Sequence, residues 1–271
     1  RHSPLPYPDR EWQNVLMSSI LGESPGEYAS SWISLNRSQG HWTSETFGDY
    51  LRIHASKRPT QLAVVDNGET ISWADLLNEV ERVSAGLAGL GIGPGDAVAV
   101  QLVNSIELAV SILAIWELGA IYQPLNPVYR KAECTALIGA VEPEAVIASN
   151  KTEEFDHPGL LDEVIADLDI SPHKVIVGSK RTNWTSFQDL NGPTPKFSRD
   201  SLDPAIFGTT SGTTGTPKIY IHIQATQIFE AKILSEGLEL GSEDVMLAAA
   251  PITHRGALMV GLMTSLISGS R

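Results

Sequence analysis

A run of glycine, serine, threonine and a final lysine is the part of this 271-residue sequence best suited to chemistry. It covers residues 208–218, reads GTTSGTTGTPK, and lies between the apolar runs Ala205–Phe207 and Ile219–Ile221. Glycine lets the backbone take positive φ and approach a ligand, so consecutive N–H groups can converge on phosphate oxygens while hydroxyl groups donate further hydrogen bonds. Lys218 adds a positive charge. The pattern predicts a phosphate-binding loop between two strands.

A mobile surface loop has the same composition, and for an arbitrary loop it is the more common case. The order of the residues favours the phosphate loop. A Walker A loop needs glycine directly before its lysine and a helix after it. Here Pro217 precedes Lys218, and the strand-like run IYIHI follows. The sequence therefore predicts a phosphate loop of a different kind.

Alternating strand and helix patterns surround this loop. A hairpin is expected where Leu62–Asp66 turns at Asn67-Gly68. Helices are expected over Trp73–Leu90, started by Ser72 and Asp75 as a capping box, and over Ser105–Leu118. Short apolar runs predict buried strands at Ala97–Val103, Ile121–Leu125, Ala145–Ala148, Val175–Val177 and Val245–Ala249. This alternation predicts an α/β fold, with a mostly parallel sheet flanked by helices.

The chain is expected to divide into three parts. Residues 1–40, rich in proline, serine and glycine, predict an irregular extension that can hold one short helix. Residues 41–200 form a first α/β subdomain, and residues 201–271 form the phosphate-loop hairpin and the start of a second one. The polar segment 178–203 is the best candidate for the boundary between them.

Composition excludes several classes of function. With 19 Lys and Arg against 32 Asp and Glu, the net charge of −13 makes nucleic acid an improbable partner. The most apolar stretch, 257–267, is shorter than the ~20 residues of a membrane-spanning helix. The single cysteine, Cys134, cannot form an internal disulfide, which favours a cytoplasmic location. We expect Cys134 to be a small buried hydrophobic residue. No metal-ligand spacing such as HExxH or CxxC occurs, so we expect no dedicated metal site.

Residues 210–218, TSGTTGTPK, resemble the signature of the adenylate-forming superfamily, which includes acyl- and aryl-CoA ligases, peptide-synthetase adenylation domains and luciferases. Further motifs resemble that family in order and context, and the resemblance covers about Trp42 to the end of the chain. They are ISWADL at 71–76, LGIGPGD at 90–96, LGAIYQPLNP at 118–127 and APITH at 250–254. Residues 126–129 with Glu133 look more like CoA ligases than peptide-synthetase domains.

The resemblance implies roles for particular residues. His254 matches a residue that borders the acyl group, although a packing role is equally open for it. His222 stands near, and Gln224 at, the place of a histidine in relatives, and a structural role is the more expected one for His222. Ile219 replaces a common glycine after the loop lysine, and Thr253 replaces a common aromatic residue. The residues implied to bind the nucleotide phosphates are Thr210, Ser211, Gly212, Thr213, Thr214, Gly215, Thr216 and Lys218.

The function implied is that of an ATP-dependent ligase that joins a small carboxylic acid to CoA through an acyl-adenylate, with ATP, Mg²⁺ and CoA as co-substrates. Relatives continue for about as many residues again, with further nucleotide, magnesium and lid residues. We therefore expect an incomplete N-terminal domain that is not competent alone. Two alternatives stay open: a peptide-synthetase adenylation domain, and a non-catalytic nucleotide- or partner-binding remnant. A peroxisomal location also stays open, because its C-terminal signal would lie outside this sequence.

Overall fold

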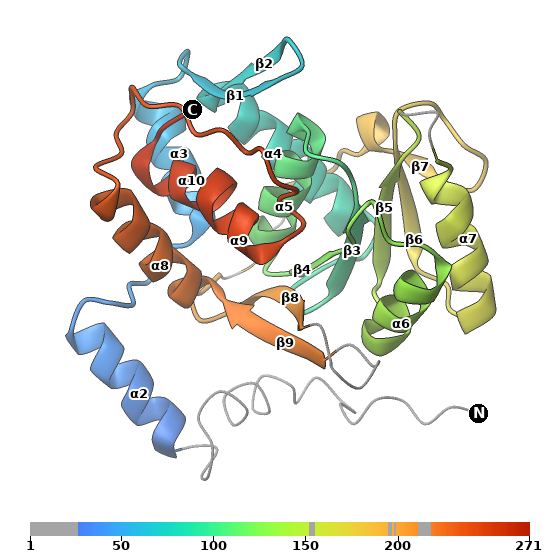
Figure 1. The fold of residues 1–271 in the computed structure, drawn as a ribbon, viewed down its shortest axis with the longest axis horizontal. Helices are drawn as coiled ribbons and strands as arrows, with labels where there is room; N and C mark the ends of the chain where they lie inside the picture. The colour runs from blue at the N-terminus through green and yellow to red at the C-terminus, as the bar shows by residue number, and fades with distance from the viewer. Residues whose placement is uncertain (1–26, 152–154, 195–196, 198, 211–217) are drawn as a thin grey trace.

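A seven-stranded sheet forms the centre of the structure (Figure 1), a computed structural model that describes residues 27–151, 155–194, 197, 199–210 and 218–271. All neighbouring strands in it are parallel except the last pair, which is antiparallel. The strand order is β7 (Thr185–Ser186), β6 (His173–Val177), β5 (Ala145–Ser149), β3 (Ala97–Gln101), β4 (Ile121–Pro124), β8 (Pro204–Thr210) and β9 (Lys218–Ile223). This confirms the predicted α/β class.

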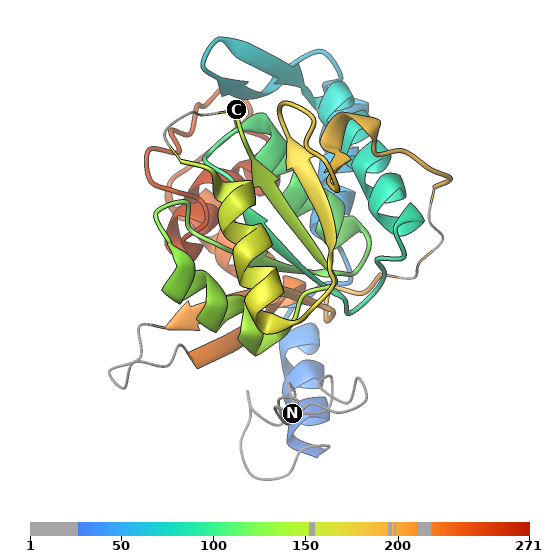
Figure 2. The ribbon, with the colours of Figure 1, turned by 90° about the vertical axis from the view of Figure 1, so that its right-hand side faces the viewer.

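Helices cover both faces of the sheet, which explains why its inner strands are mostly apolar. Helices α4 (Trp73–Gly89) and α5 (Ile106–Glu117) pack on one face, against Val98 and Val100 of β3. Helices α6 (Lys131–Val141) and α7 (His157–Leu168) pack on the other, against Ala99, and lie in front of the sheet in Figure 2. Strands β3, β5 and β6 therefore contribute alternate residues to two separate cores.

Local signals place several elements as predicted. Strands β1 (Leu62–Asp66) and β2 (Glu69–Ser72) form a hairpin through Asn67 and Gly68, both with positive φ. The Ser72 hydroxyl accepts a hydrogen bond from the Asp75 N–H at 3.1 Å and starts α4. The remaining helices and turns are α2 (Glu27–Ser38), α3 (Phe47–Lys57), η2 (Phe187–Asp189), α8 (Gln224–Gly237), α9 (Arg255–Leu258), η3 (Met259–Met263) and α10 (Thr264–Ser268).

The strand predicted at Val245–Ala249 is wrong. This segment runs without regular structure, and the side chain of Leu247 is 85% exposed. Its backbone has few partners: the Met246 N–H donates to the Arg271 carbonyl at 2.8 Å, and the Ala249 N–H donates within the segment. A strand is defined by a ladder of hydrogen bonds to a neighbouring strand, and apolar sequence alone does not supply one.

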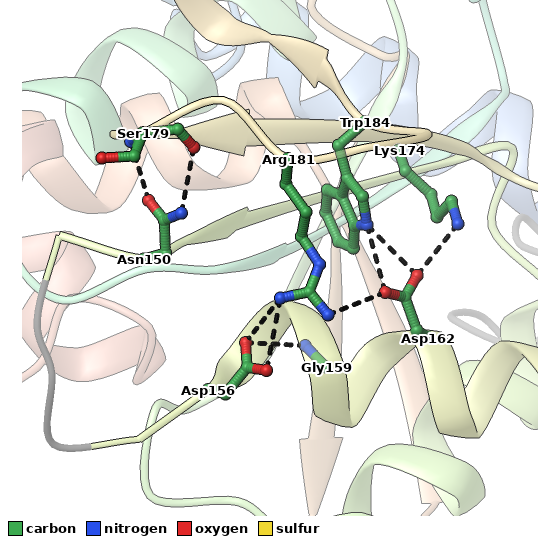
Figure 3. Close-up of polar contacts among 8 residues, drawn as sticks. All are labelled: Asn150, Asp156, Gly159, Asp162, Lys174, Ser179, Arg181 and Trp184. Atoms are coloured by element: carbon green, nitrogen blue, oxygen red, sulfur yellow. Dashed lines mark hydrogen bonds and ion pairs between the residues drawn. The ribbon is translucent and has the colours of Figure 1, made fainter.

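A polar cluster at α7 and β6 lies at the end of the sheet far from β8 and β9 (Figure 3). Asp162 of α7 accepts hydrogen bonds from the Trp184 indole N–H at 3.1 Å, the Lys174 ammonium at 2.9 Å and the Arg181 guanidinium at 3.1 Å. Arg181 also donates to Asp156 at 3.0 Å, just before the same helix. The segment between β6 and β7 is thus held on α7 by charge-assisted hydrogen bonds.

The structure describes only part of the three expected divisions of the chain. Residues 1–26 of the predicted extension lie outside the described residues, and α2 is the helix at its end. Strands β8 and β9 belong to the same sheet as β3–β7, and the boundary near residue 200 stays a prediction. Among the described helices, none has both the length and the apolar character needed to cross a membrane.

Candidate functional site

The hairpin of β8 and β9 carries the predicted phosphate loop. The two strands pair antiparallel. Pro204 pairs with Ile223 at one end, and Thr210 pairs with Lys218 at the other, so Thr210 and Lys218 lie directly opposite each other. The other predicted loop residues, Ser211, Gly212, Thr213, Thr214, Gly215 and Thr216, lie outside the described residues. The structure therefore brings together the two ends of the loop.

The hairpin opens at the carboxyl edge of the parallel sheet, because β8 runs parallel to β4 and ends at Thr210. At this edge the chain leaves β3 through α5 on one face of the sheet, and leaves β4 through α6 on the other face. In open α/β sheets, ligands bind outside the carboxyl ends of the strands where such connections diverge. The predicted loop follows the strand next to that point.

A glycine and a tyrosine face each other closely in the hairpin. Gly208 of β8 pairs with Tyr220 of β9, and a Cβ built on Gly208 would lie 2.1 Å from the phenol Cζ and 2.4 Å from the hydroxyl oxygen. The phenol ring therefore lies directly over the Gly208 backbone, where only glycine fits. On the same face of β9, the Tyr220 and His222 rings meet edge to face, with centroids 4.9 Å apart. These contacts shape the strand just below the loop.

A pocket of about 570 Å³ lies beside β9. Arg255, the first residue of α9, lines it and forms an ion pair with Glu230 of α8. Burial, and secondarily the Arg255 charge, lowers the pKa of His222 to about 4, so its imidazole is neutral at neutral pH. The other residues that line the pocket are Tyr220, Ile221, Ile223 and Thr226.

His254 directly precedes Arg255, a residue that lines this pocket, and is the N-cap residue of α9. Its side chain is exposed, so the structure shows no packing role in the core for it. Arg255, which follows His254, and β9, which follows the predicted phosphate loop, line the same pocket. The segment predicted to border the acyl group thus lies near the phosphate-loop hairpin, and the role of His254 stays a proposal.

Sequence reasoning missed Asn104, which holds this segment in place. Its side-chain amide donates to the carbonyls of Ala248 at 3.0 Å and Ala250 at 2.9 Å, and its oxygen accepts from the Ile252 N–H at 2.9 Å. Asn104 follows the carboxyl end of β3. A polar residue directly after the predicted strand Ala97–Val103 was the signal available, but the sequence does not show its partners 144–148 residues away.

Gln224 and Cys134, both discussed in the sequence analysis, are buried in the fold. Gln224 is 1% exposed, and its side-chain oxygen accepts from the Phe47 N–H at 3.1 Å, at the start of α3. Its position at the helix start thus links two helices. Cys134 is fully buried, which confirms its expected character, and burial raises the pKa of its thiol to about 11.

Metal ligands are not gathered in the described part of the chain. Among those residues, no group of three or more His, Cys, Asp and Glu side chains lies where it could hold a metal ion. A magnesium ion at this site would need ligands from a nucleotide or from residues beyond the described set.

Comparison with known proteins agrees with the resemblance seen in the sequence. Residues 51–271 match the family model described as AMP-binding enzyme. The chain is 29% identical over 252 residues to the salicyl-AMP ligase / salicyl-S-ArCP synthetase of Mycobacterium tuberculosis, covering 89% of this chain and 44% of that protein. It is 30% identical over 249 residues to the 2,3-dihydroxybenzoate-AMP ligase of Bacillus subtilis, covering 91% and 45%.

The fold is similar to solved structures as well. The apo structure of Mycobacterium smegmatis MbtA superposes with a TM-score of 0.82 at 28% identity, covering 93% of this chain and 47% of that one. The chain thus spans about half the length of these relatives. Because the family model matches residues 51–271, the chain belongs to the AMP-binding enzyme family.

Proposed function

We propose that the protein to which this chain belongs activates a small aromatic carboxylic acid with ATP. In this reaction a carboxylate oxygen attacks the α-phosphorus, the bond to the bridging oxygen breaks, and pyrophosphate leaves with that electron pair. The product is an acyl-adenylate. The observation that carries the proposal is the family match over 51–271, joined to a hairpin that closes the predicted phosphate loop at the carboxyl edge of the sheet.

Residues 210–218 would hold the β- and γ-phosphates. Charge accumulates on the leaving pyrophosphate as the reaction proceeds, and donors fixed in advance stabilise it at little reorganisation cost. Backbone N–H groups, hydroxyl groups and the Lys218 ammonium are such donors. Magnesium bound to ATP would neutralise phosphate charge here, as it does in P-loop enzymes. The described residues supply no ligand set for it.

The acid is proposed to be aromatic because the names of the similar proteins include salicyl and 2,3-dihydroxybenzoate groups. The thiol that accepts the acyl group has two candidates. Residues 126–129 with Glu133 favour free CoA, whereas the name of the M. tuberculosis relative favours a carrier protein. Incubating the complete protein with ATP, salicylate and either CoA or a phosphopantetheinyl carrier domain distinguishes them, because only the true acceptor yields a thioester.

Pyrophosphate exchange tests the adenylation step. In the complete protein, Lys218→Ala should lower acid-dependent ATP–pyrophosphate exchange by about 10²-fold or more, the usual cost of removing such a donor. Lys180→Ala is the matched control, because this exposed lysine pairs with Asp189 at the opposite end of the sheet. It should leave exchange unchanged. Exchange at the wild-type rate in Lys218→Ala would refute the assignment.

A non-catalytic nucleotide-binding role is the remaining alternative. Calorimetric titration of the 271-residue chain with MgATP tests it. Tight binding by this chain, together with no pyrophosphate exchange in the complete protein, supports this role, and thioester formation by the complete protein refutes it.

A further inference from the structure

The pocket beside β9 offers a positive charge that internal contacts only partly satisfy. We propose that it is an oxyanion-binding site in which Arg255 holds a carboxylate or phosphate group of a small-molecule substrate, with Glu230 as the internal competitor for that guanidinium. The identity of the ligand rests on the proposed function, whereas the binding of an oxyanion does not.

The argument begins with the hydrogen bonds of Arg255. A guanidinium has several N–H donors in a planar fork, suited to two parallel bonds with a carboxylate or phosphate. Glu230 pairs with the Nη2 end only. The Nε–H is buried and has no acceptor among the described residues. A buried donor without a partner is unfavourable, so a reorientation of Arg255 onto an incoming oxyanion would satisfy a group that is now unsatisfied.

The remaining lining residues favour an anion over a cation. None of the six residues that line the pocket is acidic, and Arg255 is the charged one among them. His222 is neutral at neutral pH for the reasons given above, so it can donate or accept a hydrogen bond without adding charge. Glu230 itself is 44% exposed at its side chain, so it can turn to solvent when an anion replaces it.

The size and position of the pocket indicate a small organic ligand. A volume of about 570 Å³ lies in the ordinary range for small-molecule sites. Ile221 and Ile223 add apolar surface beside the polar groups. Tyr220 joins the pocket to the hairpin, because its phenol lies over Gly208, two residues before Thr210. An acid substrate and the phosphate chain of a nucleotide are therefore the two sources of an oxyanion at this place.

Binding measurements on the 271-residue chain test the site. Benzoate, phthalate and inorganic pyrophosphate are titrated separately, and the Arg Nε–H and His222 imidazole signals are followed by NMR. Arg255→Gln should weaken binding about tenfold or more, by removal of a charge-assisted hydrogen bond. Glu230→Gln should strengthen it several-fold, because the competing carboxylate is gone. Arg181→Gln is the matched control, since Arg181 is 32% exposed against 31% for Arg255 and, like Arg255, pairs with a carboxylate.

The two substitutions of the pocket must act in opposite directions. If they do so for benzoate or phthalate, the site takes the acid; if they do so for pyrophosphate, it takes the phosphate chain. Equal binding of all three probes by wild type and Arg255→Gln overturns the proposal. That failure leaves adenylation untouched, because adenylation is judged separately by the effect of Lys218→Ala on pyrophosphate exchange.

Discussion

The contact between Gly208 and Tyr220 makes a sharp prediction about the hairpin. Replacing Gly208 with alanine puts a methyl group 2.1–2.4 Å from three atoms of the phenol, well inside the ordinary 3.4–4 Å contact range. The ring must therefore move by more than an ångström. Overpacking of this kind costs about 1–3 kcal/mol. Because Tyr220 is only half-buried and can swing towards solvent, we expect about 1–2 kcal/mol.

The assay is urea unfolding of the 271-residue chain followed by tryptophan fluorescence, with the free energy of unfolding extrapolated to water. Gly208→Ala is measured alone and in the Tyr220→Ala background. With the ring absent, the added methyl group meets no phenol. The coupling between the two substitutions should therefore be about 1–2 kcal/mol, far above the ~0.3–0.5 kcal/mol of independent sites.

Gly237→Ala serves as the matched control. Gly237 ends α8, and nothing lies within 4 Å of a Cβ built on it. Alanine there should be neutral or stabilise by up to about 1 kcal/mol, because it lowers the entropy of the unfolded chain and favours the helix. An equal cost of Gly208→Ala with and without the phenol would show that the ring does not exclude a side chain at 208.

Two further predictions concern stability. Asp162→Ala should destabilise the chain by about 2 kcal/mol, because it leaves the buried Trp184 indole N–H without its acceptor; Asp167→Ala on the same helix breaks only an exposed ion pair and should cost at most about 0.5 kcal/mol in the same urea experiment. Acidification should destabilise the fold between about pH 6.5 and 4, because the unfolded chain binds a proton at His222 that the folded chain, with its pKa lowered to about 4, rejects. His222→Gln should flatten that decline in urea unfolding across this pH range, and an unchanged slope would show that His222 is not buried as described.

Several elements could be predicted from the sequence because their causes are local. Ser72 and Asp75 are three residues apart, so the cap of α4 is set within one turn. The turn at Asn67-Gly68 could be predicted for the same reason, since both residues tolerate the positive φ that the turn requires. The apolar run Ala97–Val103 is typical of a strand buried on both faces, and the structure confirms a buried strand at Ala97–Gln101. The position of the loop at 208–218 between two strands was likewise predictable from residue order, whereas its phosphate-binding role stays a prediction.

The tertiary structure decided what depends on distant partners. Val245–Ala249 is as apolar as a strand, but no neighbouring strand pairs with it among the described residues, and pairing is a property of two segments. Asn104 binds a segment almost 150 residues away, and Arg255 shares a pocket with His222 and pairs with Glu230 because α8 and the start of α9 lie beside β9. Sequence spacing encodes turns, caps and periodicity, because these act over a few residues. Which side chains share a pocket follows from the order of the strands and the packing of the helices, and the free energy of that arrangement is spread over the whole core.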